Sequence, residues 1–374
     1  MQVNDNVRMK HFGNFIALLI LAINALFTGL LLLVAYSPYI QPVTHPVQSC
    51  FGLTFPIFAL INGAFLIFWL VIQRYKTALL PLIGFLLCYS QLRTYLPLNF
   101  HTANPPEESI KFLSYNIMGF NGAVKKDGKN PILTYLKESN ADILCLQKYA
   151  SDESPRRLTQ KDIERELKDY PYHRISVVGS GSGYTNKIAC YSKFPILSAR
   201  VLNYPSGYNG SVLYELKLNE DTITLINNHL ESNKLTKADK DIYEDILKAP
   251  EKEKVKSGAR LLVHKLAEAS AIRAPQADTI AREIASSRYP SVIVCGDFND
   301  TPISYAHRVI AQNLDDAFTQ SGRGLGISYN QNKFYFRIDN ILISKNLQSY
   351  NCTVDRSIKE SDHYPIWCYI AKRQ

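Results

Sequence analysis

The segment CGDFND (residues 295–300) follows the apolar run SVIV, and two segments with similar side chains come later in the chain. RIDN (residues 337–340) lies next to the run ILIS, and SDHYP (residues 361–365) lies directly before IWCYI. Short runs of apolar, β-branched residues predict buried strands. The three segments therefore place acidic, amide and imidazole side chains at the rim of a β core.

These side-chain types together suit the hydrolysis of a phosphate ester with the help of a hard cation. Carboxylates hold Mg²⁺, amides bind phosphate oxygens, and a His–Asp pair handles protons and charge. Water would then attack phosphorus in line, without a covalent intermediate. His, Asp and Ser also form acyl-transfer triads, but the sequence has no G-x-S-x-G nucleophile elbow.

Three earlier segments extend the pattern: YN (residues 115–116), LCLQ (144–147) and NNHL (227–230). In this order the segments resemble the endonuclease/exonuclease/phosphatase superfamily, which includes pancreatic deoxyribonuclease, abasic-site endonucleases, inositol-phosphate phosphatases and neutral sphingomyelinases. The resemblance covers roughly residues 108–374. It implies a four-layer αββα sandwich and a divalent metal, Mg²⁺ or Mn²⁺.

The local patterns from residue 110 onward predict many strands and few, clustered helices, which is typical of an α+β protein with two packed sheets. The charged stretch from residue 234 to about 287 is helical in character. We expect a membrane anchor over residues 1–100, a polar linker over 101–109 and the phosphoesterase-like domain over 110–374.

The N-terminal part contains three apolar runs, at residues 15–35, 51–72 and 78–92, the last extended by 95–98. The first two are long enough to span a bilayer, and we predict about three transmembrane helices. A cleaved signal peptide is the alternative for the first run. Its length, the missing small-x-small cleavage site and the second run behind it argue against that alternative.

Basic residues beside the predicted spans indicate an orientation. Arg8 and Lys10 precede the first span, and Arg74 and Lys76 lie between the second and third. The positive-inside rule places both pairs in the cytoplasm. Three spans then put the C-terminal domain outside the cytoplasm (on the periplasmic side in a bacterium). Arg93 opposes this slightly, and losing the third span would reverse it.

The charge balance bears on the substrate. Beyond residue 104 the chain has 37 basic and 32 acidic residues, a net charge of about +5. That is mild for a dedicated DNA-binding surface. A membrane anchor and mild charge favour a lipid headgroup or a small phosphoester over nucleic acid, with an extracytoplasmic nuclease as the enzymatic alternative. The oligomeric state is left open.

Asp297 and Asn299 are the strongest pair of candidate site residues. Alternation along a strand would send both side chains to one face, with Phe298 on the other. An acid and an amide side by side can orient an attacking water and hold a phosphate oxygen. Both are also candidate metal ligands.

The resemblance assigns roles to five further residues. Asn116 would lie beside the metal, and Asp362 would be a second metal carboxylate. His229 would donate to a phosphate oxygen. His363 would contact the scissile phosphate or transfer a proton, with Asp339 fixing its tautomer. Outside this context, an Asn at a strand end is usually a turn residue and a lone His is usually structural.

Lys148 departs from the family pattern, which has the main metal-binding Glu at this position. An ammonium cannot ligate Mg²⁺ and repels it. The metal could rest on the remaining ligands with weaker affinity, or Asp152 or Glu153 could replace the Glu. Lys148 could itself be the fixed cation facing the phosphate, or the site is a non-catalytic binder of a phosphorylated ligand. A register change that turns Lys148 to solvent is the fifth reading. We favour retained activity.

Overall fold

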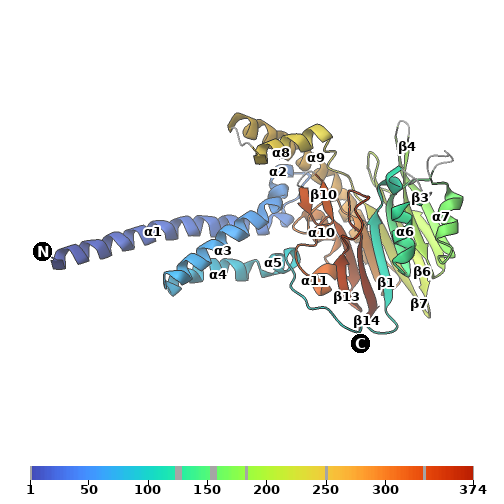
Figure 1. Cartoon of the computed structure of the whole chain (residues 1–374), viewed down its shortest axis with the longest axis horizontal. Coiled ribbons are helices and arrows are strands. Elements are labelled where there is room, and N and C mark those ends of the chain that lie inside the picture. Colours follow the sequence, from blue (N-terminus) through green and yellow to red (C-terminus); the bar gives the residue numbers. More distant parts are fainter. Residues whose placement is uncertain are drawn as a thin grey trace.

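The computed structural model describes residues 2–122, 129–151, 158–181, 184–248, 252–331 and 334–373. Figure 1 shows two parts: an elongated bundle of N-terminal helices and a β sandwich covered by further helices. The bundle comprises α1 (Gln2–Ala35), η1 (Ser37–Tyr39), α2 (Pro46–Ser49), η2 (Cys50–Thr54), α3 (Phe55–Val71), α4 (Tyr75–Leu87) and α5 (Tyr89–Tyr95).

Two segments of the bundle are long and apolar enough to cross a membrane, namely His11–Tyr39 and Pro46–Val71. The expected third transmembrane helix is not among them, so that prediction was wrong. The corresponding helix α4 has 13 residues, or about 20 Å of helix, whereas a bilayer core is about 30 Å thick. The helix ends at Cys88, whose ψ of 24° separates α4 from α5.

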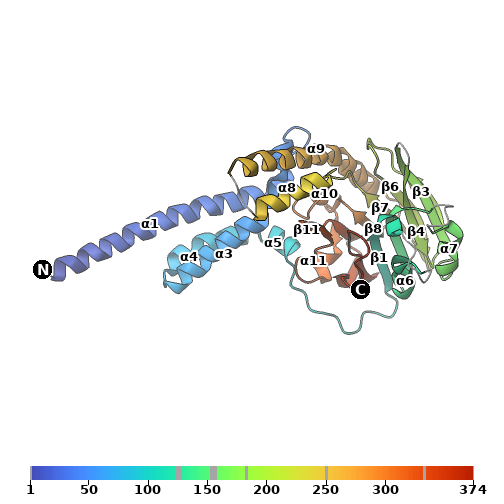
Figure 2. The ribbon, with the colours of Figure 1, turned by 45° about the horizontal axis from the view of Figure 1, so that its top comes forward.

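The bundle forms a helical hairpin packed along a longer helix. In Figures 1 and 2, α3 runs away from the sandwich and α4 returns beside it, with α1 alongside and the N-terminus far from the sandwich. Buried polar side chains join the helices: Trp69 Nε1 donates to Asn24 Oδ1 at 3.0 Å, and Thr28 Oγ1 donates to Asn62 Oδ1 at 2.8 Å. Satisfied polar pairs of this kind fix how helices meet.

The sandwich consists of two six-stranded sheets. The first has the order β13-β14-β1-β2-β4-β3 and the second β5-β6-β7-β8-β12-β9. The strands of the first sheet are β1 (Ile110–Asn116), β2 (Ile143–Tyr149), β3 (Tyr172–Gly181), β4 (Tyr184–Ser192), β13 (Leu347–Val354) and β14 (Ile366–Lys372). Those of the second are β5 (Ile196–Val201), β6 (Gly210–Leu218), β7 (Asp221–His229), β8 (Val292–Asp297), β9 (Leu314–Asp316) and β12 (Asp339–Ser344). A separate hairpin pairs β10 (Tyr329–Gln331) with β11 (Phe334–Phe336).

Helices cover both outer faces of the sheets. The helices are η3 (Met118–Gly122), α6 (Pro131–Glu138), α7 (Gln160–Glu166), α8 (Lys237–Lys248), α9 (Lys252–Ala285), α10 (Tyr305–Ile310) and α11 (Ala317–Ser321). Leu136 of α6 and Ile163 of α7 pack on the first sheet, and Ile280 of α9 and Val309 of α10 pack on the second. The expected α+β sandwich of two sheets with flanking helices is thereby confirmed.

The core between the sheets explains why these segments form strands. Phe112, Ile143, Leu225, Ile293 and Ile341 come from five different strands and are fully buried or nearly so in one cluster. Each belongs to a run in which alternate side chains face this cluster, as expected for paired sheets. The short elements α10, α11, β9, β10 and β11 were not anticipated from the sequence.

The helical bundle is docked on the sandwich through specific contacts. Arg308 Nε donates to Pro38 O at 2.8 Å, and Arg337 Nη2 donates to Thr94 O at 2.8 Å. Ile303 packs in an apolar cluster with Leu31 and other bundle residues. The two parts therefore share an interface as well as a covalent connection.

Candidate active site

Three predicted site residues form one row across adjacent strands. In the register of the second sheet, Asp297 of β8 lies between His229 of β7 and Asp339 of β12. Residues paired directly across strands point to the same face. Each continues the inward-facing residues of its own strand, such as Ile293 and Cys295 before Asp297 and Ile341 after Asp339. The side chains that face the space between the sheets are therefore apolar up to this row and polar at it.

Gly296 allows this row to form. Its φ is +120°, and a Cβ at this position would lie 2.0 Å from the carbonyl oxygen of Asn228 on β7. Only glycine tolerates such an approach with a positive φ. The close contact between β7 and β8 sets His229 and Asp297 opposite one another.

We expect Gly296→Ala to reduce stability by about 1–3 kcal/mol, the usual cost of a strained residue, and to displace Asp297. Unfolding of the full-length protein in denaturant and hydrolysis of a phosphodiester would measure both effects. Gly324→Ala is the matched control, because Gly324 also has a positive φ (+85°) but a Cβ there would meet nothing within 4 Å. Equal effects of the two substitutions would contradict the role assigned to the close contact.

His363 lies against Asp339, as the expected role of Asp339 requires. The Nδ1–H of His363 donates to Asp339 Oδ2 at 2.7 Å. His363 Nε2 is 3.5 Å from Asp297 Oδ2 and 3.4 Å from Asn116 Nδ2. Asn116 Nδ2 also donates to Asp297 Oδ2 at 2.9 Å. The first sheet thus supplies Asn116, the second supplies both carboxylates, and all four side chains are buried.

The charges of this cluster are mutually dependent. Burial lowers the pKa of His363, but the carboxylates of Asp339 and Asp297 outweigh it and raise that pKa to about 9. Burial raises the pKa of Asp297, and the positive charges of His363 and Lys148 only partly offset this. The arrangement keeps an imidazolium beside a carboxylate that is a better base than an exposed aspartate.

His229 is a neutral histidine with a defined tautomer. Asn186 Nδ2 lies 3.3 Å from His229 Nδ1; because the amide nitrogen can only donate, Nδ1 accepts and Nε2 carries the proton. Burial, followed by the charge of Lys148, lowers the pKa of His229 well below its usual value. Nε2 is 3.6 Å from Asp297 Oδ2 and has no hydrogen-bond partner among the described residues. It is a ready donor to a phosphate oxygen.

Asn299 is positioned by a turn and not by strand alternation. The strand β8 ends at Asp297, and Asn299 has a positive φ of 52°. Its backbone N–H donates to Asp297 Oδ1 at 2.8 Å and its Nδ2 donates to Leu230 O at 2.9 Å. The expected geometry was therefore wrong, although Asn299 still lines the cavity described below.

Asp362 lies in the same cavity wall as His363. Burial opposes its ionisation, but the charges of His363, Lys148 and Lys240 lower its pKa. It is not one of the three residues, Asp297, Asp339 and His363, whose potential ligand atoms lie within 4.8 Å of one another. Asp152 and Glu153, the candidate substitute metal ligands, lie outside the described residues.

A β-bulge turns Lys148 toward the site. The pairing of β2 with β4 shifts between Leu146 and Tyr149, and Lys148 has a positive φ of 49°. Bulges beside active sites commonly redirect a side chain in this way. Lys148 lines the cavity, and its charge acts on Asp297 and Asp362. The reading in which Lys148 points to solvent is therefore wrong.

Two further residues of the site were missed in the sequence. Lys240 of α8 lies in the charged stretch that was expected to be helical and was given no role, but its Nζ donates to the hydroxyl of Tyr329 at 2.7 Å and its charge acts on Asp362. Tyr329 of β10 lies edge-on to His363, with ring centroids 5.1 Å apart. Both come from elements whose position depends on tertiary packing, and no local motif marks them.

The carboxylates fit a hard divalent cation. One oxygen or nitrogen from each of Asp297, Asp339 and His363 lies within 4.8 Å of the others. Asp339 Oδ1 is buried and has no hydrogen-bond partner among the described residues. Oxygen ligands of this kind are those that Mg²⁺ and Mn²⁺ prefer. Lys148 stands where the family pattern has a metal-binding Glu. The site therefore offers a cation one oxygen ligand fewer than that pattern, and it adds a positive charge nearby.

The site thus combines a buried Asp–His pair, a second histidine and an amide at the rim of two packed sheets. The chain belongs to the endonuclease/exonuclease/phosphatase family, whose sequence profile matches residues 113–363. Enzymes of this family are metal-dependent phosphodiesterases and nucleases. The profile of a domain of unknown function (DUF8431) matches residues 17–95. No curated protein matches the chain.

Three solved structures resemble this chain, and the first of them supports its fold. An endonuclease/exonuclease/phosphatase from Beutenbergia cavernae is 12% identical, with a TM-score of 0.51 over 71% of this chain and 72% of its own. TDP2 from D. rerio, complexed with a single-strand DNA product, is 16% identical, with a TM-score of 0.49 over 71% of this chain and 99% of its own. The human nocturnin catalytic domain is 14% identical, with a TM-score of 0.49 over 74% and 97%.

Proposed function

We propose that the protein is a membrane-anchored, divalent-metal-dependent phosphoesterase that hydrolyses a phosphodiester or phosphomonoester by in-line attack of water. A lipid headgroup or a small phosphoester is the favoured substrate. The observation that carries the proposal is the buried cluster of Asp297, Asp339 and His363, with Asn116 and the Nε2–H of His229 beside it. General acid, general base and phosphate-oxygen donors thus converge on one point.

Each side chain has a defined part in this reaction. Asp297 Oδ2 orients the water and accepts its proton as the water oxygen bonds to phosphorus. As the ester P–O bond breaks, the departing oxygen takes a proton from the His363 imidazolium, which Asp339 holds in place. His229 Nε2–H and the amides of Asn116 and Asn299 donate to non-bridging oxygens. One water is consumed, and an alcohol is released with phosphate from a monoester or with a phosphomonoester from a diester. Transfer of the proton from Asp297 to His363, whose Nε2 is 3.5 Å from Oδ2, restores both groups.

We assign the metal to Mg²⁺ or Mn²⁺, held by the carboxylates of Asp297 and Asp362 with the amide oxygens of Asn116 and Asn299, and Asp339 within reach. When bound, the cation draws off the negative charge that develops on the phosphoryl oxygens. The position of Lys148 next to these ligands favours weaker binding than in a site with a glutamate there.

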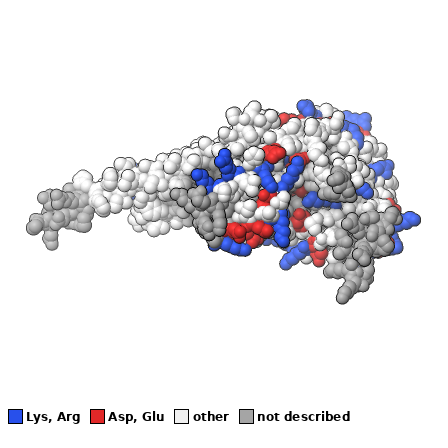
Figure 3. All heavy atoms as spheres, turned by 90° about the horizontal axis from the view of Figure 1, so that it is seen from above, with Lys and Arg blue, Asp and Glu red and all other residues white. Residues whose placement is uncertain are grey.

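We further propose that residues 1–100 anchor the protein, that 101–109 is a linker and that the domain over 110–374 lies outside the cytoplasm. The α3–α4 turn, which carries Arg74, lies at the end of the hairpin away from the sandwich (Figure 1). Arg74 Nη2 donates to Asn14 Oδ1 of α1 at 2.9 Å. The positive-inside rule applied to this arrangement supports an extracytoplasmic domain, because α4 and α5 still return the chain to the sandwich end of the bundle although α4 is short (Figure 1). In Figure 3, the visible surface of the bundle between the far end of the helical hairpin and the sandwich is uncharged.

A second candidate function follows from Lys148 alone. An ammonium aimed into the site can bind a phosphorylated ligand without turnover, which would make the protein a non-catalytic relative. A nuclease is the other enzymatic outcome, and its activity should fall steeply with salt.

The proposal predicts metal-dependent turnover by the full-length protein in detergent. We expect it to hydrolyse a chromogenic phosphodiester with Mg²⁺ or Mn²⁺, and we expect EDTA to reduce the rate to background. DNA and a choline phospholipid, assayed beside it, rank the substrate classes. Turnover that persists in EDTA would contradict the metal requirement, and binding of phosphate without turnover of any ester would favour the non-catalytic alternative.

A further inference from the structure

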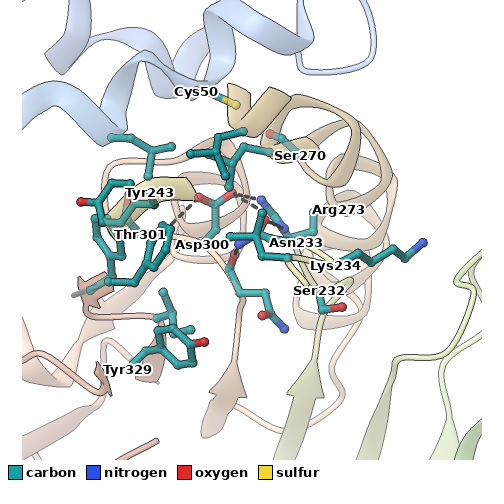
Figure 4. A pocket seen from close by; sticks show the side chains of 18 of the residues that line it. Cys50, Ser232, Asn233, Lys234, Tyr243, Ser270, Arg273, Asp300, Thr301 and Tyr329 are labelled. Carbon is teal, nitrogen blue, oxygen red and sulfur yellow. Dashed lines mark hydrogen bonds and ion pairs between the residues drawn. The ribbon is translucent and has the colours of Figure 1, made fainter. Parts of the chain in front are cut away.

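A cavity of about 580 Å³ adjoins the candidate site, which is within the usual range for small-molecule pockets. Lys148, Asp362 and His363 line one end, and Cys50 and Leu53 of the N-terminal bundle line another part of its wall. Figure 4 shows these ends: Tyr329 lies at one side and Cys50 lies at the other, beneath the ribbon of the bundle. The cavity therefore extends from the site to the junction with the bundle.

Between these ends the wall is largely apolar. Leu262 and Leu266 of α9 line it, as does Ile338. Tyr243 of α8 stacks on Phe334 of β11, with ring centroids 4.1 Å apart and an interplanar angle of 27°. The apolar part of this wall can bind hydrocarbon.

The charges in the wall are distributed unevenly. In the middle, Arg273 donates to Asp300 and to Glu231 O, so the charges of Arg273 and Asp300 offset each other. Lys234, which also lines the wall, is paired with Glu231 at 2.8 Å. Lys148 and Lys240 lie at the end that adjoins His363. Positive charge is therefore concentrated where a phosphate would react.

The far end of the cavity coincides with the beginning of the apolar helices. α3 starts at Phe55, two positions after Leu53. Beyond this point the bundle carries exposed apolar side chains, including Leu60 at 76% and Leu86 at 64% exposure. Apolar surface of this extent marks contact with lipid or a partner. The Cys50 end of the cavity therefore lies beside the level at which the bundle would enter a bilayer.

We propose that the cavity binds the hydrocarbon chain of a phosphorylated amphiphile, with the phosphate at His363 and the chain between α9 and the bundle. The inference rests on the proposed phosphoesterase function and narrows its substrate to a phosphoester that carries a linear hydrocarbon chain. The occupant comes from a membrane, and the cavity holds the chain within the protein while the phosphate reacts.

The test uses the full-length protein in lipid nanodiscs and p-nitrophenyl phosphodiesters with methyl, butyl and octyl chains. We expect kcat/KM to increase with chain length, by up to roughly fourfold per buried methylene, which corresponds to about 0.8 kcal/mol. Leu266→Trp and Leu53→Trp fill the cavity from two different elements, α9 and η2, and in each the octyl ester should react no faster than the methyl ester. Leu261→Trp, at a residue of α9 that is 40% exposed, is the matched control and should retain the dependence. Thermal unfolding verifies that each variant is folded.

The outcomes separate this inference from the proposed function. Equal kcat/KM for the three esters in the parent protein would overturn the inference while leaving the phosphoesterase intact, as would chain-length dependence retained in both cavity variants. If no ester is hydrolysed, the phosphoesterase proposal fails, and binding decides the inference. Calorimetry should then show octylphosphonate binding more tightly than methylphosphonate, and Leu266→Trp should abolish the difference; equal affinities in the parent would overturn the inference.

Discussion

Replacing Asp297 by alanine is expected to lower kcat/KM for a phosphodiester by about a thousandfold or more. The substitution removes the proposed general base, a role that contributes about 10²–10⁴-fold. It also removes a proposed metal ligand and the carboxylate opposite His363 Nε2. Steady-state hydrolysis by the full-length protein in saturating Mg²⁺ measures the loss.

The result requires that the variant remains folded. Burial raises the pKa of Asp297, which indicates that this ionised carboxylate is held at a cost, so we expect its removal to leave the unfolding midpoint nearly unchanged. Asp221→Ala is the matched control, because Asp221 begins the strand β7 at the end away from His229 and its side chain is 47% exposed. Full activity in a folded Asp297→Ala protein would refute the proposed site.

The second large effect is expected for Lys148→Glu. A carboxylate here supplies an oxygen ligand and replaces a positive charge with a negative one. Even in water, two unit charges at 4 Å interact by about 1 kcal/mol, so the change should increase metal affinity by at least about tenfold. Titration of activity, or of heat released, with Mn²⁺ measures the affinity.

Lys148→Gln separates charge from ligation. It removes the repulsion without adding a carboxylate, and we expect its metal affinity to lie between those of the parent and Lys148→Glu. Loss of turnover in both variants despite tighter metal binding would show that Lys148 is itself the cation that contacts the phosphate. Turnover that appears only in Lys148→Glu would identify the parent as a non-catalytic binder.

Much of the site was predictable because it continues a strand pattern. Alternation brings Asp297 and Asp339 onto the inner face of the second sheet, and pairing of β8 with β12 makes them neighbours. The position of a motif that directly follows a buried strand can therefore be predicted from the sequence of that strand. The same logic failed at Asn299, since the strand ends before it and a turn controls its direction.

The remaining features depend on contacts that a local pattern does not contain. The bulge that redirects Lys148 is a shift in register between β2 and β4, so the sequence of neither strand alone predicts it. Lys240 reaches the site because α8 folds over β10, and its neighbours in sequence are typical of an exposed helix. The third span was overestimated because apolar content continues across Cys88, whereas the helix does not.

The hydrogen bonds among Asn24, Thr28, Asn62 and Trp69 have a mechanical consequence. In the proposed membrane orientation they make the N-terminal bundle a rigid support, and the docking contacts of Arg308 and Arg337 hold the sandwich against one end of it. A domain held in this way does not rotate freely relative to the bundle, as it would on a flexible linker. The candidate site would then have a fixed distance and a fixed angle to the membrane surface. Only phosphates at that distance could reach it, whatever their chemical type.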